Sequence, residues 1–192
     1  MSYKIINAQT PENKYLKVDA SKVFHGTNLA MDRRFKPDYS PVDMIKMGIF
    51  GGAYFGLCDR GTTRPEDWER IDKLPFEIKQ VLKSKWLEGR LSDIEKGPNN
   101  MYGVKCGKNR RWWMDRLLIS DLDPLGWFEW FCHYYYGRRH EVEDRRQINR
   151  WINYRARQLG MTRYHMREGH NLDKMKQILL HWSIDYLHAG AL

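Results

Sequence analysis

The segment that most restricts the fold is DPLGWFEWFCHYYYGRR, residues 123–139, which carries seven aromatic side chains in seventeen residues. Asp123 and Pro124 are typical of the start of a helix, and Gly137 is typical of its end. On such a helix four aromatic residues share one face at the spacing i, i+3, i+4 and i+7: Trp127, Trp130, Phe131 and Tyr134. We therefore predict a helix whose aromatic face is buried in the core.

The other positions of this helix divide between a second apolar face and a polar one. The second apolar face, expected to pack against another helix, holds Phe128, Cys132 and Tyr135. The polar remainder holds Glu129, His133 and Tyr136. Because Gly137 ends the helix, we expect Arg138 and Arg139 to lie at its terminus as anion contacts.

Helical spacing of apolar residues recurs through most of the chain beyond residue 40. The segment 41–48 has the signature of a short helix, with Ser40 as N-cap, Pro41 at the first position and Asp43 three residues after the cap. Further helices are predicted within 62–75, 75–89, 108–119, 140–160 and 171–189. Residues 1–40 lack a long periodic segment, and only YKIINA resembles a short strand. We predict a mainly α-helical single domain, residues 1–192, of about six or seven helices, with an irregular segment at 1–40 and a helical core at 41–192.

The charge of the chain favours an anionic partner. The formal net charge is +9, which suits nucleic acid, a nucleotide or an acidic protein surface. The three cysteines form no C-x-x-C pair, and neither a zinc pattern nor a nucleotide-binding glycine motif is present, so no metal or cofactor is expected. Without a membrane-length apolar run or a signal-peptide pattern, we expect a soluble intracellular protein, cytoplasmic in a host cell if viral, with no membrane partner.

An arginine stripe is predicted on the helix within 140–160. Arg146, Arg150 and Arg157 lie on the side opposite Ile148, and segment 138–167 contains arginines but no lysine. Arginine has a planar fork that matches phosphate oxygens, so these residues, with Lys105 from a glycine-flanked basic segment, are candidate phosphate contacts. The alternative is an ordinary solvated charged face.

Three residues are candidates for acid or base chemistry: Asp144, His181 and Asp123. A carboxylate beside stacked aromatic residues and arginines suits an enzyme that acts on an unstacked base. His181, Asp185 and His188 follow helical spacing, which could orient an imidazole as a general base. The alternatives are helix capping by Asp123, dipole compensation by Asp144 and a surface pair at His181. Three aromatic residues are candidates to line or stack in a pocket: Tyr54, Tyr134 and Trp151.

The motifs of the aromatic segment resemble an uncharacterised family found in phages and in algal and fungal genomes. Its pattern is DP-x-GWF-x-W-x-C-x-Y-x-x-GRR, followed by D-x-RQI-x-RW and LLHW; here these motifs begin at Asp123, Asp144 and Leu179. Upstream GGAYF and YGVKCG segments are also similar, so the resemblance covers most of residues 41–185. It departs at Phe131 and His133. No activity is established for that family, so the resemblance implies that these residues work as a unit and that viral or nuclear DNA contexts are plausible.

These observations lead to one expectation and two alternatives. We expect a nucleic-acid-binding protein, with DNA favoured, that could carry a base-directed activity such as a glycosylase-like or DNA-modification-associated one. One alternative is a structural or interaction protein whose arginines meet an acidic protein partner. The other is an enzyme acting on a small phosphorylated metabolite.

Overall fold

The chain folds mainly into helices, as the sequence predicted. A computed structural model of the protein describes residues 15–26, 30–51, 54–55, 71–82, 100–108 and 110–190. Its helices are α1 (Pro41–Lys46), α3 (Phe76–Leu82), α5 (Arg110–Met114), α6 (Trp127–Tyr135), α7 (Glu141–Arg167) and α8 (Asp173–Leu180), with short 3₁₀ helices η1 (Ala20–Lys22) and η2 (Tyr186–Ala189). Strands β1 (Phe24–His25) and β2 (Arg138–Arg139) pair antiparallel.

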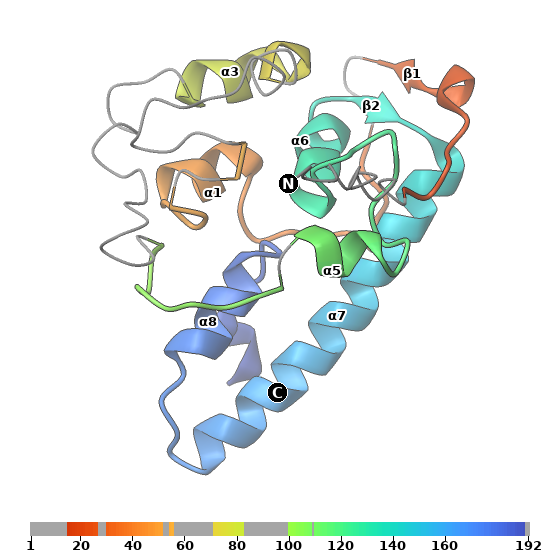
Figure 1. Cartoon of the computed structure of the whole chain (residues 1–192). Coiled ribbons are helices and arrows are strands. Elements are labelled where there is room, and N and C mark those ends of the chain that lie inside the picture. Colours follow the sequence, from red (N-terminus) through yellow and green to blue (C-terminus); the bar gives the residue numbers. More distant parts are fainter. Residues whose placement is uncertain are drawn as a thin grey trace, which may run out of the picture.

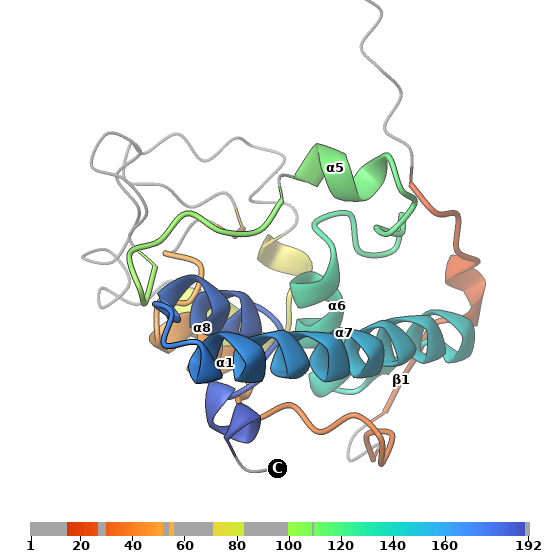
Figure 2. The ribbon, with the colours of Figure 1, turned by 90° about the horizontal axis from the view of Figure 1, so that it is seen from below.

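The long helix α7 organises the arrangement of the others. It runs diagonally across the molecule and turns into α8, so that the two helices form a hairpin (Figure 1). Helix α6 lies between α5 and α7, while the orange segment around residues 30–40 lies on the opposite side of α7 from α5 (Figure 2). Helix α1 packs on α3 and α6. Helices α1 and α8 both lie to the left of α6 in Figure 1 and in Figure 2.

Helix α1 forms because its caps are local. Ser40 Oγ accepts a hydrogen bond from the backbone N–H of Asp43, and the Asp43 carboxylate accepts one from the N–H of Ser40. This capping box satisfies two amides that a helix start leaves without partners. The helix predicted at 41–48 is confirmed at Pro41–Lys46.

The core is aromatic and is centred on a residue of the irregular N-terminal segment. Phe35 packs edge-to-face on Trp130, Phe131, Tyr134 and Trp151, with ring centroids 5.0 to 5.8 Å apart. All four predicted residues of the α6 stripe are buried. An edge-to-face arrangement suits the quadrupoles of aromatic rings. Segment 30–40 therefore buries apolar surface and also fixes how the aromatic rings of the core face one another.

Two predictions about the other faces of α6 were wrong. Glu129 was expected on the polar side, but it is only 5% exposed, and its Oε2 accepts a hydrogen bond from the backbone N–H of Leu125 at 2.8 Å. Tyr135 was expected to be covered by a second helix, but its side chain is exposed. The helix begins at Trp127, three residues later than predicted. Glu129 therefore lies in its first turn, where the carboxylate of Glu129 binds the backbone of the preceding turn and is buried.

Helix α6 is capped by a residue from elsewhere in the chain. Gly126 occupies the N-cap position and has no side chain to offer. The hydroxyl of Tyr54 replaces it: it accepts a hydrogen bond from the N–H of Phe128 at 3.1 Å and donates one to the carbonyl of Leu125 at 2.8 Å. The start of α6 therefore depends on a contact that spans more than seventy residues of sequence.

Several expected elements differ in extent or lie outside the described residues. The strand at YKIINA and most of the helix within 62–75 lie outside them, although 71–73 are helical. Helix α5 is shorter than the predicted 108–119, and the last predicted helix divides into α8 and η2. No helix in the described ranges combines the length and the apolar character that crossing a membrane requires.

Candidate functional site

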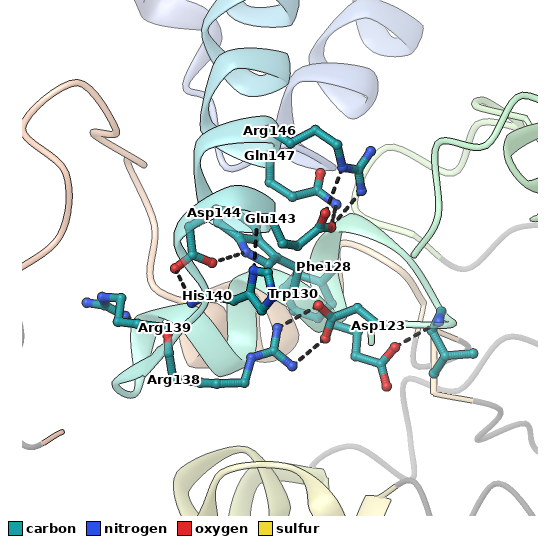
Figure 3. A network of polar contacts seen from close by, with 12 residues as sticks. Asp123, Phe128, Trp130, Arg138, Arg139, His140, Glu143, Asp144, Arg146 and Gln147 are labelled. Atoms are coloured by element: carbon teal, nitrogen blue, oxygen red, sulfur yellow. Dashed lines mark hydrogen bonds and ion pairs between the residues drawn. The ribbon is translucent and has the colours of Figure 1, made fainter. Parts of the chain in front are cut away.

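The two arginines at the end of α6 lie inside the protein. Arg138 donates two hydrogen bonds to the carboxylate of Asp123, with N–O distances of 2.7 and 2.5 Å, and both side chains are buried (Figure 3). Arg139 donates to the backbone carbonyls of Tyr134 and Arg138, and its guanidinium lies 4.0 Å from the centre of the Tyr134 ring. The expectation that they are anion contacts is corrected, because carboxylate and carbonyl acceptors inside the protein hold both guanidinium groups.

The two candidate catalytic carboxylates are also held by structural partners. Asp144 accepts hydrogen bonds from Nε1 of Trp130 at 2.9 Å and from the N–H of His140 at 2.8 Å (Figure 3). Burial raises its pKa, and these hydrogen bonds oppose the rise. Burial also raises the pKa of Asp123, to about 6, against the opposing charge of Arg138. Both carboxylates join α7 and the α5–α6 connection to the core.

The first half of the arginine stripe is covered instead of facing solvent. Arg146 pairs with the buried carboxylate of Glu143 at 2.6 Å. Arg146 and Arg150 both donate to the carbonyl of Leu118, at 3.4 and 2.7 Å. The connection between α5 and α6 therefore lies over this side of α7, which corrects the prediction of a solvent-facing stripe. Arg157, farther along the helix, is exposed as predicted.

A cavity of about 320 Å³ lies where α5, α6, α7 and α8 meet. Its walls are mostly aromatic, and this is the volume of a small-molecule site. The aromatic residues of the wall are Phe50, Tyr54, Trp113, Trp127, Phe128, Tyr154 and Trp182. The cavity combines residues from position 50 to position 182, so only the folded chain creates it.

The charged side chains of the cavity wall are all basic. They are Lys108, Arg110 and Arg150, and the described residues of the wall include no Asp or Glu. The guanidinium of Arg150 lies 5.6 Å from the Trp182 ring and 6.0 Å from the Trp113 ring. Burial lowers the pKa of Arg150 to about 10, with a smaller contribution from Arg146. An anion in the cavity would offset this burial of positive charge, whereas a cation would add to it.

Two residues of the cavity wall carry buried hydrogen-bond donors without a partner. Nε of Arg110 and Nε1 of Trp127 are buried from solvent, and neither donates to any acceptor in the described part of the chain. The Arg110 guanidinium is nevertheless fixed, because its Nη2 donates to the hydroxyl of Tyr15 at 2.6 Å. A buried donor without an acceptor costs about 1–3 kcal/mol, so each of these two atoms reduces the stability of the fold.

His181 is the candidate catalytic residue that lines the cavity. Its ring stacks on Phe50, with centroids 5.0 Å apart, and its Nδ1 lies 3.9 Å from Sγ of Cys106. Burial lowers the pKa of His181 to about 4 and raises that of Cys106 to about 11. Both groups are therefore neutral near pH 7. The expected run of His181, Asp185 and His188 does not form, because α8 ends at Leu180 and Asp185 accepts from Tyr39 instead.

One of the three predicted stacking residues reaches the cavity. Tyr54 is part of its wall. Tyr134 and Trp151 belong to the core: the Tyr134 hydroxyl accepts from the N–H of Asp32 at 2.8 Å, and Nε1 of Trp151 donates to the carbonyl of Trp182 at 2.8 Å. Their polar atoms anchor neighbouring backbone, so neither ring is open to a ligand.

A second feature, of which the sequence analysis identified only Lys105, is a basic and aromatic surface beside the cavity. The guanidinium of Arg116 lies 4.0 Å from the centre of the Trp112 ring, and Nζ of Lys108 lies 6.0 Å from it. Lys105, Lys108 and Arg111, which come shortly before Trp112 in the chain, are exposed. We call these five residues the α5 surface. The segment CGKNRRWW contained the signal, since three basic residues are followed there directly by two tryptophans.

Comparison of the chain with protein-family models, with curated proteins and with solved structures finds no match. The resemblance of the aromatic segment to phage, algal and fungal proteins therefore stays a prediction. Within the described residues, His, Cys, Asp and Glu side chains nowhere gather in a group of three or more that could hold a metal ion.

Proposed function

We propose that the protein binds nucleic acid, with DNA favoured, through the α5 surface and the cavity beside it. The observation that carries this proposal is the meeting of aromatic rings with Lys108, Arg110 and Arg150 in a wall that includes no described carboxylate. Nucleic-acid sites combine the same two elements, cations for phosphates and aromatic faces for bases. The net charge of +9 supports an anionic partner of this kind.

We place the interface away from the arginines that the sequence predicted as phosphate contacts. Arg138 and Arg139 are buried, and Arg146 is engaged by Glu143. The exposed cations Lys105, Lys108 and Arg111 take their place on the α5 surface. Arg111 pairs with Asp115 at 2.9 Å, but both members of this pair are exposed, unlike the buried Glu143 that holds Arg146. The side chains of these three cations are open to solvent, so a phosphate can approach them without dismantling the core.

The role proposed for the cavity is binding. Asp123 and Asp144, which would supply acid and base chemistry, lie outside its wall and have structural partners. His181 is in the wall and neutral, but it hydrogen-bonds to the backbone of Ile49 and its Nδ1 lies beside Cys106, so its role in the wall is to offer an aromatic face.

Salt dependence of binding tests the proposal. Affinity for a duplex and for a single strand is measured by fluorescence anisotropy between about 50 and 200 mM salt, and log affinity should fall linearly and steeply with log salt. In the triple variant Lys105→Gln, Lys108→Gln, Arg111→Gln, affinity should fall and the slope should decrease by up to about 3, near 0.9 per lost phosphate contact.

The matched control removes the same charge from another side. Arg33, Lys36 and Arg167 are exposed, and the segment that carries Arg33 and Lys36 lies across α7 from α5 (Figure 2). Replacing these three by glutamine should leave the slope nearly unchanged. Equal losses in both triple variants, or no binding near 50 mM salt, would refute the proposed interface.

A further inference from the structure

We propose that the cavity holds one unpaired nucleotide, its base against the aromatic wall and its phosphate at the basic side chains. This inference rests on the proposed function and makes it more specific, because it names what enters the cavity. Three properties of the described residues support it: the size of the cavity, the sign of its charges and its position beside the α5 surface.

The charge of the cavity wall argues against a cationic or a purely apolar occupant. Rings arranged around a space of about 320 Å³ could also suit a quaternary ammonium group, which binds to aromatic faces. Here Lys108, Arg110 and Arg150 would repel such a cation, and the described wall has no carboxylate to compensate. A purely apolar ligand would leave the same charges without a counterion. The wall therefore favours a planar aromatic ligand that is also an anion.

The cations of the wall specify the hydrogen-bonding character of that ligand. The charged groups of Lys108, Arg110 and Arg150 can only donate hydrogen bonds, so they favour a ligand with acceptors. Arg150 makes both of its described hydrogen bonds through Nη1, to Leu118 and Gln147. Ring nitrogens, carbonyl oxygens and phosphate oxygens of a nucleotide are acceptors of this kind.

The neighbouring surface explains how a nucleotide would arrive. Lys108 belongs both to the α5 surface and to the cavity wall. Trp113, which lines the cavity, is in edge-to-face contact with Trp112 on that surface, with ring centroids 4.8 Å apart. A strand that follows the exposed cations can therefore place one unstacked base in the cavity. Such a base is available in a single strand or at an unpaired position of a duplex.

The test compares three DNA duplexes that differ at one position. The first carries a bulged 2-aminopurine, the second an abasic bulge and the third is fully paired. The bulged base should strengthen binding on the order of ten- to a hundredfold over the other two, as stacking of one base in a site predicts. On binding, the 2-aminopurine should become shielded from quenching by acrylamide.

Two variants separate the cavity from the surface. Ile178→Phe adds volume to the cavity wall from α8, and Trp113→Leu removes one ring of the wall. Either variant, shown to be folded by near-ultraviolet circular dichroism, should lose the preference for the bulged base. Each should keep the salt-dependent binding to the paired duplex, since Lys105, Lys108 and Arg111 are unchanged.

The outcomes distinguish this inference from the proposed function. The inference about the cavity would be overturned by equal binding of the three duplexes, or by a bound 2-aminopurine that acrylamide still quenches. The proposed function would still stand in that case if binding depended on salt as predicted. If no DNA binds, calorimetry with free dAMP shows whether the cavity binds a free nucleotide. Binding of dAMP that Ile178→Phe abolishes supports a nucleotide cavity that takes a free nucleotide and overturns the nucleic-acid function. No binding of either kind overturns both.

Discussion

The carboxylate of Asp123 and the guanidinium of Arg138 form a buried ion pair with two hydrogen bonds, at 2.7 and 2.5 Å. The pair connects the turn before α6 with strand β2 after it, and so it links the two segments that flank this helix. Removing one member of such a pair leaves the other charge buried and unpaired, which costs far more than the pair itself contributes.

We therefore predict that Asp123→Asn lowers the free energy of unfolding by about 3–5 kcal/mol. Urea unfolding followed by tryptophan fluorescence measures the change. The control is Glu141→Gln, which breaks the exposed pair between Glu141 and Arg145 and should cost under about 1 kcal/mol. A small effect at Asp123, equal to that of the control, would mean that Arg138 finds solvent or another acceptor.

The contrast between α1 and Arg138 shows what a sequence can reveal. The bounds of α1 follow from Ser40, Pro41 and Asp43, which act within one turn of helix, so the local pattern was sufficient. The position of Arg138 depends on Asp123 and on the pairing of β2 with β1, which no local pattern encodes. An arginine beside a glycine at a helix end is usually exposed, and that expectation failed here for a reason that only tertiary contacts supply.

Gly137 offers a second prediction, based on backbone geometry. Its φ is +96°, and a Cβ at this position would lie 2.3 Å from the carbonyl oxygen of Gly26. Neither the conformation nor the contact with backbone tolerates a side chain, so Gly137→Ala should lower the free energy of unfolding by at least about 1–3 kcal/mol. Thermal and urea unfolding both measure this change.

Gly160 is the matched control for that substitution. It lies within α7, and a Cβ there meets nothing within 4 Å. Gly160→Ala should therefore stabilise the protein, by about 0.5–1 kcal/mol, because alanine favours the helix. Opposite signs at the two glycines are expected. A destabilising Gly160→Ala would show that this part of α7 is not an ordinary helix in solution.

The cavity is the part of the candidate site that the sequence could not predict. Its wall draws on Phe50, Trp113, Trp127 and Trp182, which lie on four separate elements or connections. The helical spacing of α6 correctly placed Trp127 in the core, but it could not show that Nε1 of this residue would lack a partner. The signal of a binding site here is a cavity with a basic and aromatic wall, and that is visible only in three dimensions.

Tyr54→Phe tests the capping of α6 by a distant hydroxyl. The substitution removes the acceptor of the Phe128 N–H and the donor to the Leu125 carbonyl while keeping the ring in the cavity wall. We expect a loss of about 1–3 kcal/mol in the free energy of unfolding, because partly buried backbone groups lose their partner. Tyr164→Phe, at an exposed tyrosine, should change little. Equal stabilities of the two variants would mean that water replaces the hydroxyl.

The pH dependence of stability should report the burial of His181. Burial lowers its pKa to about 4 in the folded protein, whereas a histidine in an unfolded chain titrates near 6.5. Between these values the unfolded chain takes up a proton and the folded protein does not, so stability falls as the pH is lowered from about 6.5 to 4. The full shift corresponds to a loss of up to about 3 kcal/mol. His133, whose pKa burial lowers to about 3, adds in the same direction.

The His181→Gln variant isolates this contribution, because other groups titrate in the same range and cancel in the difference. The free energy of unfolding of the parent should fall relative to that of the variant as the pH is lowered from 7 to 4. Only the parent has an imidazole that takes up a proton in the unfolded chain and stays neutral in the folded protein. The same subtraction for His25→Gln measures what an exposed histidine contributes. If the difference between parent and His181→Gln stayed constant over this range, the imidazole would have the same pKa in the folded and unfolded chains. It would then take up a proton inside the cavity as the pH falls. Its positive charge would then join those of Lys108, Arg110 and Arg150, and the need for an anion in the cavity would be greater still.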